Sequence, residues 1–289
     1  MNAVLFKQQL SQDVFLMRVH APLIASERRA GQFIILSVDE DFGERIPLTI
    51  ADADPKEGSI TLIFQRVGHT TDALAQLEPG DSVAAILGPL GTPTHIEKFG
   101  TAVCVGGGIG IAPLHPIVQA LKQAGNRLIV ILGARTKDLI ILEDRMRALA
   151  DELIVCTDDG SYGRKALVTE PLKECCQRTP KPDLAVAIGP PLMMKFCAEA
   201  TRPFAVKTMV SLNTIMVDGT GMCGGCRITV GDQTKFVCVD GPEFDGHKVD
   251  FGELMNRLKA YKPQEQEAHD RWHRDHDCKL ASPRAGGGQ

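Results

Sequence analysis

The stretch 104-CVGGGIGIAP-113 decides the fold, because it joins a continuous apolar strand to a helix through a turn rich in glycine. The strand is predicted over residues 101–108 and the helix over 113–125. Glycines let the backbone approach a ligand closely, and a helix N-terminus offers unpaired N–H groups to phosphate. The turn is therefore predicted to bind a pyrophosphate, and a tight turn without a ligand is the alternative. The candidate residues are Gly107, Gly108, Gly110 and Pro113.

Apolar strands and helical patterns alternate downstream of this turn. Strands are predicted at 128–134, 153–160 and 184–189, with helices near 139–150 and 166–177. Continuous apolar strands that alternate with helices indicate a doubly wound parallel sheet, whose ligands lie beyond the carboxyl ends of the strands.

Strand-length runs with turn signals between them fill the first part of the chain, for example 59–67 and 82–88, and predict a small antiparallel barrel or sandwich. A short region dense in glycine follows the alternating part and holds three of the nine cysteines, so it is expected to gain stability from a metal. The last segment is charged and ends in a Gly-rich tail that is predicted to be disordered. The fold class is a multidomain α+β and α/β protein, divided into 1–98, 99–205, 206–255 and 256–289.

The composition is that of a globular protein, with 289 residues, 44% hydrophobic residues and a formal net charge of −4. This charge offers no basic face for nucleic acid or for an anionic membrane. No export signal and no apolar run of about 18 residues is found, so a cytoplasmic location is expected.

The cysteines of 218-DGTGMCGGC-226 form a C-x2-C pair, and Cys238 supplies a third thiolate after eleven intervening residues. The plant-type 2Fe-2S spacing is C-x4-C-x2-C with a distant fourth cysteine. Asp218 stands where the first cysteine would be, and iron accepts a carboxylate oxygen as well as sulfur. Asp218, Cys223, Cys226 and Cys238 are therefore predicted to hold a 2Fe-2S cluster. A zinc site of the same four residues and a redox dithiol are the alternatives.

The remaining cysteines fall into two groups. Cys104, Cys156 and Cys197 lie on apolar strands or a helix and are predicted to be small buried hydrophobic residues. Cys175, Cys176 and Cys278 have no assigned role.

The turn G-G-G-I-G-I-A-P, preceded by a predicted barrel, resembles the nicotinamide-binding turn of the ferredoxin-NADP reductase superfamily. The resemblance implies an FAD-binding barrel in which Pro47, Leu48 and Thr49 form the flavin strand, with the Thr49 hydroxyl near flavin N5 as the catalytic group. The superfamily arginine would stand at position 46, which is Ile46 here, so its role passes to Arg45 only if the strand is bulged, because adjacent side chains face opposite ways. An exposed arginine on an ordinary strand is the alternative.

The stretch 66-RVGHTT-71 resembles the loop that holds the FAD pyrophosphate in this superfamily. Backbone N–H groups and threonine hydroxyls can bond phosphate oxygens there. The candidates are Val67, Gly68, Thr70 and Thr71, and a plain hairpin turn is the alternative.

Three loops follow predicted strands at the place where the superfamily holds its nicotinamide nucleotide. The candidates are Gly133, Arg135, Asp158, Asp159, Gly160, Gly189 and Pro190. Arg135 could meet a 2′-phosphate or pair with Asp138 or Glu143, and NAD(H) is favoured over NADP(H).

Taken together, residues 1 to 255 resemble the small subunit of NADH-dependent reduced ferredoxin:NADP+ oxidoreductase, also called sulfide dehydrogenase. The resemblance implies an NAD(P)H-dependent oxidoreductase subunit in a heterodimer with a larger iron-sulfur flavoprotein, which bifurcates electrons and so links NADH indirectly to NADPH and ferredoxin. It also implies that NADH reduces the flavin beside Thr49 and that the flavin converts this two-electron unit into single electrons for the cluster. The electron-transfer subunit of dihydroorotate dehydrogenase, whose cluster uses four cysteines, and a regulatory zinc-binding module are the alternatives.

Overall fold

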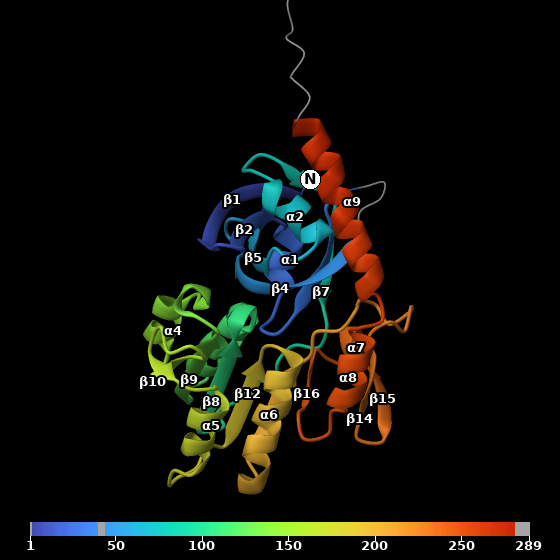
Figure 1. Cartoon of the computed structure of the whole chain (residues 1–289). Helices are drawn as coiled ribbons and strands as arrows, with labels where there is room; N and C mark the ends of the chain where they lie inside the picture. The colour runs from blue at the N-terminus through green and yellow to red at the C-terminus, as the bar shows by residue number, and fades with distance from the viewer. Residues whose placement is uncertain (1, 40–43, 281–289) are drawn as a thin grey trace, which may run out of the picture.

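The computed structural model describes residues 2–39 and 44–280, and an antiparallel barrel lies above a parallel sheet in Figure 1. Within the described residues the barrel sheet has the strand order β6-β1-β2-β5-β4-β3-β7, and its paired strands are antiparallel. Its strands are β1 (Asn2–Ser11), β2 (Val14–His20), β3 (Phe33–Ser37), β4 (Arg45–Asp54), β5 (Ser59–Gln65), β6 (Ser82–Val83) and β7 (Ala85–Leu90), with helices α1 (Pro22–Glu27) and α2 (His69–Gln76). The predicted N-terminal barrel is confirmed.

Strand β3 is apolar on both faces, because each face packs on a different core. Ile34 and Leu36 point into the barrel core, whereas Phe33 and Ile35 belong to a second core that they share with residues from the C-terminal part of the chain. A strand that is buried on both sides is typically a continuous apolar run. The run 33-FIIL-36 has this form.

The second sheet has the order β11-β10-β9-β8-β12-β13-β16 within the described residues. Its strands β8 (Thr101–Gly107), β9 (Arg127–Ala134), β10 (Glu152–Thr157), β11 (Arg164–Lys165), β12 (Leu184–Ile188) and β13 (Lys207–Ser211) are parallel, and β16 (Glu243–Asp245) is antiparallel to β13. The connections are α3 (Ile111–Gln123), α4 (Glu143–Leu149), α5 (Thr169–Cys176) and α6 (Pro191–Thr201), with 3-10 turns η1 (Gly108–Gly110), η2 (Lys137–Leu139) and η3 (Arg202–Phe204). The predicted doubly wound sheet is confirmed.

The helix expected over 139–150 is shorter than predicted. The chain forms η2, passes through Leu142 with a left-handed φ of 56°, and only then enters α4. A left-handed residue interrupts a right-handed helix, so one helix cannot run through this position.

The C-terminal part begins with a hairpin of β14 (Arg227–Val230) and β15 (Gln233–Phe236), followed by α7 (Val237–Asp240) and α8 (Phe251–Arg257). The charged segment then forms α9 (Lys262–Leu280), which runs back along the barrel and contacts α2 (Figure 1). The Gly-rich tail expected to be disordered lies outside the described residues. Among the helices of the described part, none is long and apolar enough to cross a membrane.

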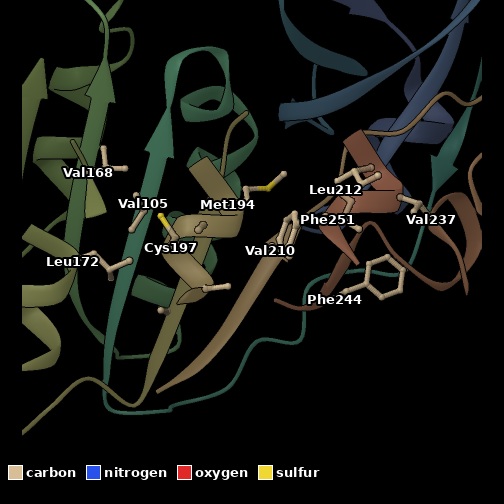
Figure 2. Close-up of a cluster of buried hydrophobic side chains, with 14 of the residues drawn as sticks. Val105, Val168, Leu172, Met194, Cys197, Val210, Leu212, Val237, Phe244 and Phe251 are labelled. Carbon is tan, nitrogen blue, oxygen red and sulfur yellow. The ribbon is translucent and has the colours of Figure 1, made fainter. Parts of the chain in front are cut away.

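Two shared cores hold these parts together. Figure 2 shows Val105 and Val210 of the parallel sheet packed in one apolar core with Leu212, Val237 and Phe251, which lie within residues 206–255. On the other face of the sheet, α3 packs against barrel strand β4. The barrel, the parallel sheet and the C-terminal part therefore form one packed body.

Candidate flavin, nicotinamide and cluster sites

The predicted flavin strand is β4, and its register with β3 is regular from Arg45 to Thr49. Directly opposed residues of an antiparallel pair lie on the same face. Thr49 is opposite Phe33 and Pro47 is opposite Ile35, so both lie on the outer face of the barrel. Arg45 shares this face by alternation.

This register settles where the side chains around the arginine point. The bulge in β4 lies between its Ile50 and Asp52 pairings, after the flavin motif. Ile46 and Leu48 pack against the barrel core, so Leu48 offers only its backbone to a ligand on the outer face. The bulge on which the arginine role of Arg45 depended is therefore absent, and Arg45 is an exposed arginine on an ordinary strand. It shares the face of Thr49 because four residues is an even step along a strand.

The predicted pyrophosphate loop leads into α2 rather than forming a hairpin turn. The Thr71 hydroxyl accepts hydrogen bonds from the backbone N–H groups of Val67 and Gly68, both at 3.0 Å. Thr70 donates its hydroxyl to Glu44 at 2.6 Å. Nothing lies within 4 Å of a Cβ placed on Gly68, so the approach to this helix N-terminus is open. First-turn N–H groups lack partners within a helix and suit a phosphate.

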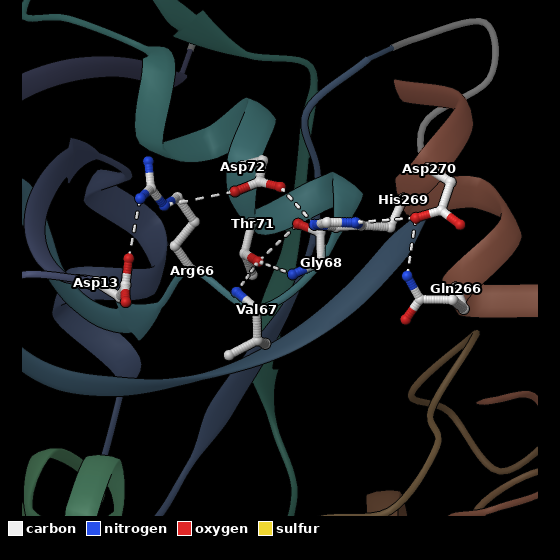
Figure 3. Close-up of polar contacts among 9 residues, drawn as sticks. All are labelled: Asp13, Arg66, Val67, Gly68, Thr71, Asp72, Gln266, His269 and Asp270. Atoms are coloured by element: carbon white, nitrogen blue, oxygen red, sulfur yellow. Dashed lines mark hydrogen bonds and ion pairs between the residues drawn. The ribbon is translucent and has the colours of Figure 1, made fainter. Parts of the chain in front are cut away.

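The C-terminal helix α9 closes one side of this loop. Figure 3 shows the Asp72 carboxylate between Arg66 and His269. The Arg66 Nε and His269 Nε2 atoms each lie 3.6 Å from a carboxylate oxygen of Asp72. His269 and Ala268 are the half-buried residues of the described first half of α9, so this contact seats the helix on α2.

The predicted nicotinamide turn lies at the topological switch point of the parallel sheet. Strands β8 and β12 are neighbours, and the chain leaves them toward opposite sides of the sheet. Such sheets bind ligands in the crevice beyond the carboxyl ends of these two strands. Gly107, Gly108 and Gly110 lie at the carboxyl end of β8, Gly189 and Pro190 lie at that of β12, and Gly110 packs against Ile188 and Gly189. The predicted residues are therefore brought together.

Close packing explains two of these glycines. A Cβ on Gly110 would overlap the carbonyl oxygen of Ile188, and a Cβ on Gly107 would overlap the sulfur of Met193. A Cβ on Gly189 would overlap Met193 as well, so the Met193 side chain lies against the ends of both strands, a contact that the sequence alone did not reveal. Pro113 lies within the first turn of α3, which begins at Ile111.

The outer end of the crevice carries exposed charged groups. Arg135 follows β9, and Asp158 and Asp159 follow β10, whose strand ends are adjacent. The Asp159 carboxylate accepts hydrogen bonds from the Ser161 N–H and hydroxyl at 2.9 and 2.7 Å, and these bonds hold its pKa below the usual value. Gly133 lies against Val168, and Gly160 has a φ of +80° in the turn. Asp159 therefore shapes the loop, while Asp158 is an exposed acceptor.

The four predicted cluster ligands form two pairs, Asp218 with Cys223 and Cys226 with Cys238. The Cys226 and Cys238 sulfurs are 3.2 Å apart and buried. Asp218 accepts the Cys223 backbone N–H at 2.7 Å and the Thr220 N–H at 2.9 Å, and these bonds hold its pKa below the usual value. Within the described residues, no three His, Cys, Asp or Glu side chains converge on one point as for a single ion. Two pairs suit a cluster of two irons, each with two protein ligands.

The backbone around the pairs also suits a cluster. The Gly225 N–H donates to the Cys223 sulfur and the Cys238 N–H donates to the Cys226 sulfur, each at 3.4 Å. Such bonds to sulfur tune an iron–sulfur centre. Burial raises the pKa of the Cys238 thiol to about 12 when no metal is bound, and a coordinated metal removes that proton.

The other described cysteines are buried, as predicted for Cys104, Cys156 and Cys197. Cys104 and Cys197 have pKa values raised to about 12 by burial, which leaves them as unreactive thiols. Cys156 is also buried on β10, and Cys175 and Cys176 are buried on α5. The Cys278 side chain lies outside the described part.

Comparison with known proteins gives two family matches. Residues 213–250 match the iron-sulfur cluster binding domain of dihydroorotate dehydrogenase B, and residues 104–199 match the oxidoreductase NAD-binding domain. The fold and these domains define an oxidoreductase subunit of the ferredoxin reductase type.

Relatives extend over nearly the whole chain. A Thermotoga maritima homolog of the dihydroorotate dehydrogenase B (NAD(+)) electron transfer subunit is 48% identical over 94% of this chain and 95% of its own. The corresponding Bacillus caldolyticus subunit is 34% identical over 83% and 94%. The chain therefore belongs to the family of dihydroorotate dehydrogenase B electron transfer subunits and their homologs.

Solved structures agree with this placement. A structure of NADH-dependent reduced ferredoxin-NADP oxidoreductase, described for flavin-based electron bifurcation, superposes with a TM-score of 0.89 at 47% identity, covering 94% of this chain and 98% of that one. A Neisseria gonorrhoeae ferredoxin NADP+ reductase with bound FAD and NADP shares the fold, with a TM-score of 0.57 at 16% identity over 71% of this chain and 90% of that one. The comparisons support the expected cofactors, FAD, a 2Fe-2S cluster and NAD(H).

Proposed function

We propose that this chain is the small subunit of an NADH-dependent reduced ferredoxin:NADP+ oxidoreductase, in which it transfers electrons among NAD(H), FAD and a 2Fe-2S cluster. One observation carries the proposal: the predicted flavin strand and the cluster loop meet on one face of the barrel. Thr49 and Pro47 lie beside Phe33 and Ile35 on that face. Phe33 and Ile35 also pack into the same core as the predicted cluster ligands Cys226 and Cys238.

Each cofactor has its own set of residues in this proposal. FAD lies along Arg45, Pro47 and Thr49 and the backbone of Leu48, with its pyrophosphate at the loop Val67, Gly68, Thr70 and Thr71. NAD(H) occupies the crevice of Gly107, Gly108, Gly110, Pro113, Gly189 and Pro190, with its adenosine end at Gly133, Arg135, Asp158, Asp159 and Gly160. When bound, the flavin exchanges a hydride with nicotinamide and single electrons with the cluster. The protein positions the groups, and the Thr49 hydroxyl is the catalytic group nearest the reacting flavin atom.

The two ligand pairs assign the irons. We propose that Asp218 and Cys223 bind one iron and that Cys226 and Cys238 bind the other. The first pair lies at the surface, where Cys223 is exposed, and the second is buried. An iron held by Asp218 and Cys223 would therefore lie nearer the surface than one held by Cys226 and Cys238.

The partner docks, in this proposal, on the surface around the cluster loop, and the charged helix α9 contributes to the same face. Met222 beside the ligand Cys223 is 87% exposed, and Val217 and Val239 are also exposed there. Exposed apolar groups next to a redox centre suit a protein interface. The partner would be the larger iron-sulfur flavoprotein subunit of a heterodimer, which links this chain indirectly to NADPH and ferredoxin.

A second candidate is an electron transfer subunit of a dihydroorotate dehydrogenase complex, which the matched cluster domain favours. Asp218 at the first ligand position favours the oxidoreductase, because the dihydroorotate cluster is expected to use four cysteines. Purification of the native complex separates the two, since the partner is either a dihydroorotate dehydrogenase or a larger flavoprotein with further iron–sulfur clusters.

The limits 1–98, 99–205, 206–255 and 256–289 are proposed as functional units, although β13 and β16 of the third unit complete the parallel sheet. A cytoplasmic location remains a prediction.

Anaerobic analysis of the purified chain tests the proposal. We expect about two irons, two sulfides and one FAD per chain, with both chromophores bleached by NADH. Zinc without iron or flavin would contradict it and favour the zinc-binding module.

A further inference from the structure

The loop 218–226, which carries three of the predicted cluster ligands, contacts the barrel through Gly219. Gly219 directly follows the ligand Asp218 and has a φ of +74°. A Cβ at Gly219 would lie 2.7 Å from Ile35 Cγ1 and 2.7 Å from Leu90 Cδ1. Real Cβ atoms do not approach other atoms this closely, so the loop backbone lies directly on β3 and β7.

The Ile35 side chain has little room to move away from Gly219. Ile35 is buried, and its face is filled by Phe33 and residues within 206–255. Packed cores resist added volume, because extra atoms force neighbouring side chains out of their preferred rotamers. A side chain at position 219 would therefore move the loop rather than the strand.

Ile35 is also the residue opposite Pro47 of the flavin strand. Neighbouring strands are about 4.8 Å apart. A series of contacts thus links the flavin face to the cluster site. Pro47 is paired with Ile35, Ile35 contacts Gly219, and Gly219 is bonded to the ligand Asp218.

We propose that Gly219 is a positioning residue, whose contact with Ile35 and Leu90 fixes the separation between flavin and cluster. This inference rests on the proposed function, because it assigns flavin to the face of Pro47 and Thr49. It goes beyond that function in naming the residue that sets the electron-transfer distance.

The test compares Gly219→Ala and Gly219→Val with Gly231→Ala in the anaerobic holoprotein. Gly231 lies in the β14–β15 hairpin with a φ of +61°, and a Cβ there would meet only Lys248 Cδ at 3.9 Å. The two glycines share a left-handed φ, so Gly231→Ala controls for backbone strain, and the double variant described next tests the contact with the barrel. The double variant Gly219→Ala with Ile35→Ala removes the Ile35 Cγ1 atom and so relieves one of the two close contacts of the added methyl group, while the contact with Leu90 Cδ1 remains.

Three properties are measured: FAD and iron content, the rates of flavin and then cluster reduction after mixing with NADH, and hydrogen exchange of residues 33–37 in the protein without cofactors. We expect Gly219→Ala to keep both cofactors and the wild-type rate of flavin reduction. Cluster reduction should be severalfold slower, slower again in Gly219→Val, and partly restored in the double variant. Exchange at 33–37 should be faster in Gly219→Ala and unchanged in Gly231→Ala.

Wild-type cluster reduction in Gly219→Ala, or equal slowing in Gly231→Ala, would overturn the inference. Loss of the cluster from Gly219→Ala alone would also overturn it, in favour of a role in holding the cluster. A wild-type protein without FAD or iron would instead refute the proposed function, so the two failures are distinguishable.

Discussion

Thr49 of β4 stands directly opposite Phe33 of β3, so the hydroxyl of the flavin strand and an aromatic ring of the shared core lie on one face of the barrel. Antiparallel partners on one face have Cβ atoms about 5 Å apart. The proposed catalytic hydroxyl is thereby held on a rigid strand and not on a loop.

Replacing Thr49 with valine removes this hydroxyl and keeps the branched shape. We expect the rate of flavin reduction by NADH to fall about tenfold, which corresponds to one lost hydrogen bond of roughly 1.4 kcal/mol. Thr49→Ser should recover most of the rate because it restores the hydroxyl. Equal rates in the valine variant and the wild type, measured by stopped-flow absorption, would remove Thr49 from the mechanism.

Asp218 should determine the spectrum of the reduced cluster. In Asp218→Cys we expect the iron content to be retained with an altered paramagnetic resonance signal, since a thiolate replaces an oxygen ligand. Asp218→Ala should lose iron or show a strongly perturbed signal. The control is Asp232→Ala, which removes an exposed carboxylate at the tip of the β14–β15 hairpin. An unperturbed signal in Asp218→Ala would exclude Asp218 as a ligand.

Asp158 should decide the choice of nucleotide. Its exposed carboxylate follows β10, where it can accept hydrogen bonds from a ribose hydroxyl and repel a 2′-phosphate. We expect Asp158→Ser to lower kcat/KM for NADH roughly tenfold to a hundredfold, as for hydrogen bonds to a charged group. The preference for NADH over NADPH should narrow. Asp138→Ser is the control, and an unchanged preference in Asp158→Ser would place the ribose elsewhere.

Glu243 should make stability depend on pH. Glu243 is half-buried, its carboxyl lies beside Gly31 and receives a hydrogen bond from the Thr94 hydroxyl, and desolvation raises its pKa to about 7. Between about pH 4.5 and 7 the folded protein keeps a proton that the unfolded chain has released. The stability contributed by Glu243 is therefore present at low pH and is lost as pH rises through 7.

Glu243→Gln should remove this dependence. At pH 8 we expect the variant to be more stable than the wild type by up to roughly 3 kcal/mol in denaturant unfolding, and at pH 5 the two should be close. Glu27→Gln on α1, an exposed carboxylate, is the control. A constant difference between variant and wild type across this pH range would show that Glu243 does not titrate near neutrality.

Much of the fold could be predicted because the apolar patterns were long and regular. The alternation after residue 101 predicts the parallel sheet, and the cysteine spacing anticipates the contact between the Cys226 and Cys238 sulfurs. Helix α9 was expected only as a charged segment, since it is polar on almost every side and shows no apolar stripe. Its described half is held by pairs such as Glu267 with Arg271 and by the contact of His269 with Asp72.

Contacts between distant segments left no signal in the sequence. The placement of Gly219 on Ile35 and that of Glu243 beside Thr94 depend on how two domains meet, and neither residue lies in a local pattern that records its partner. The side of Arg45 could have been found from the even step to Thr49, had a regular strand been assumed.

The contact between Ile35 and Gly219 also has a consequence for folding during translation. The barrel sequence is synthesised first, yet the outer faces of Phe33 and Ile35 are covered by residues that follow some 180 positions later. At about 5–20 residues per second, a nascent barrel would carry these two apolar side chains uncovered for roughly 10 to 40 seconds. During that interval the incomplete chain exposes an apolar strand, which is a suitable binding site for ribosome-associated chaperones.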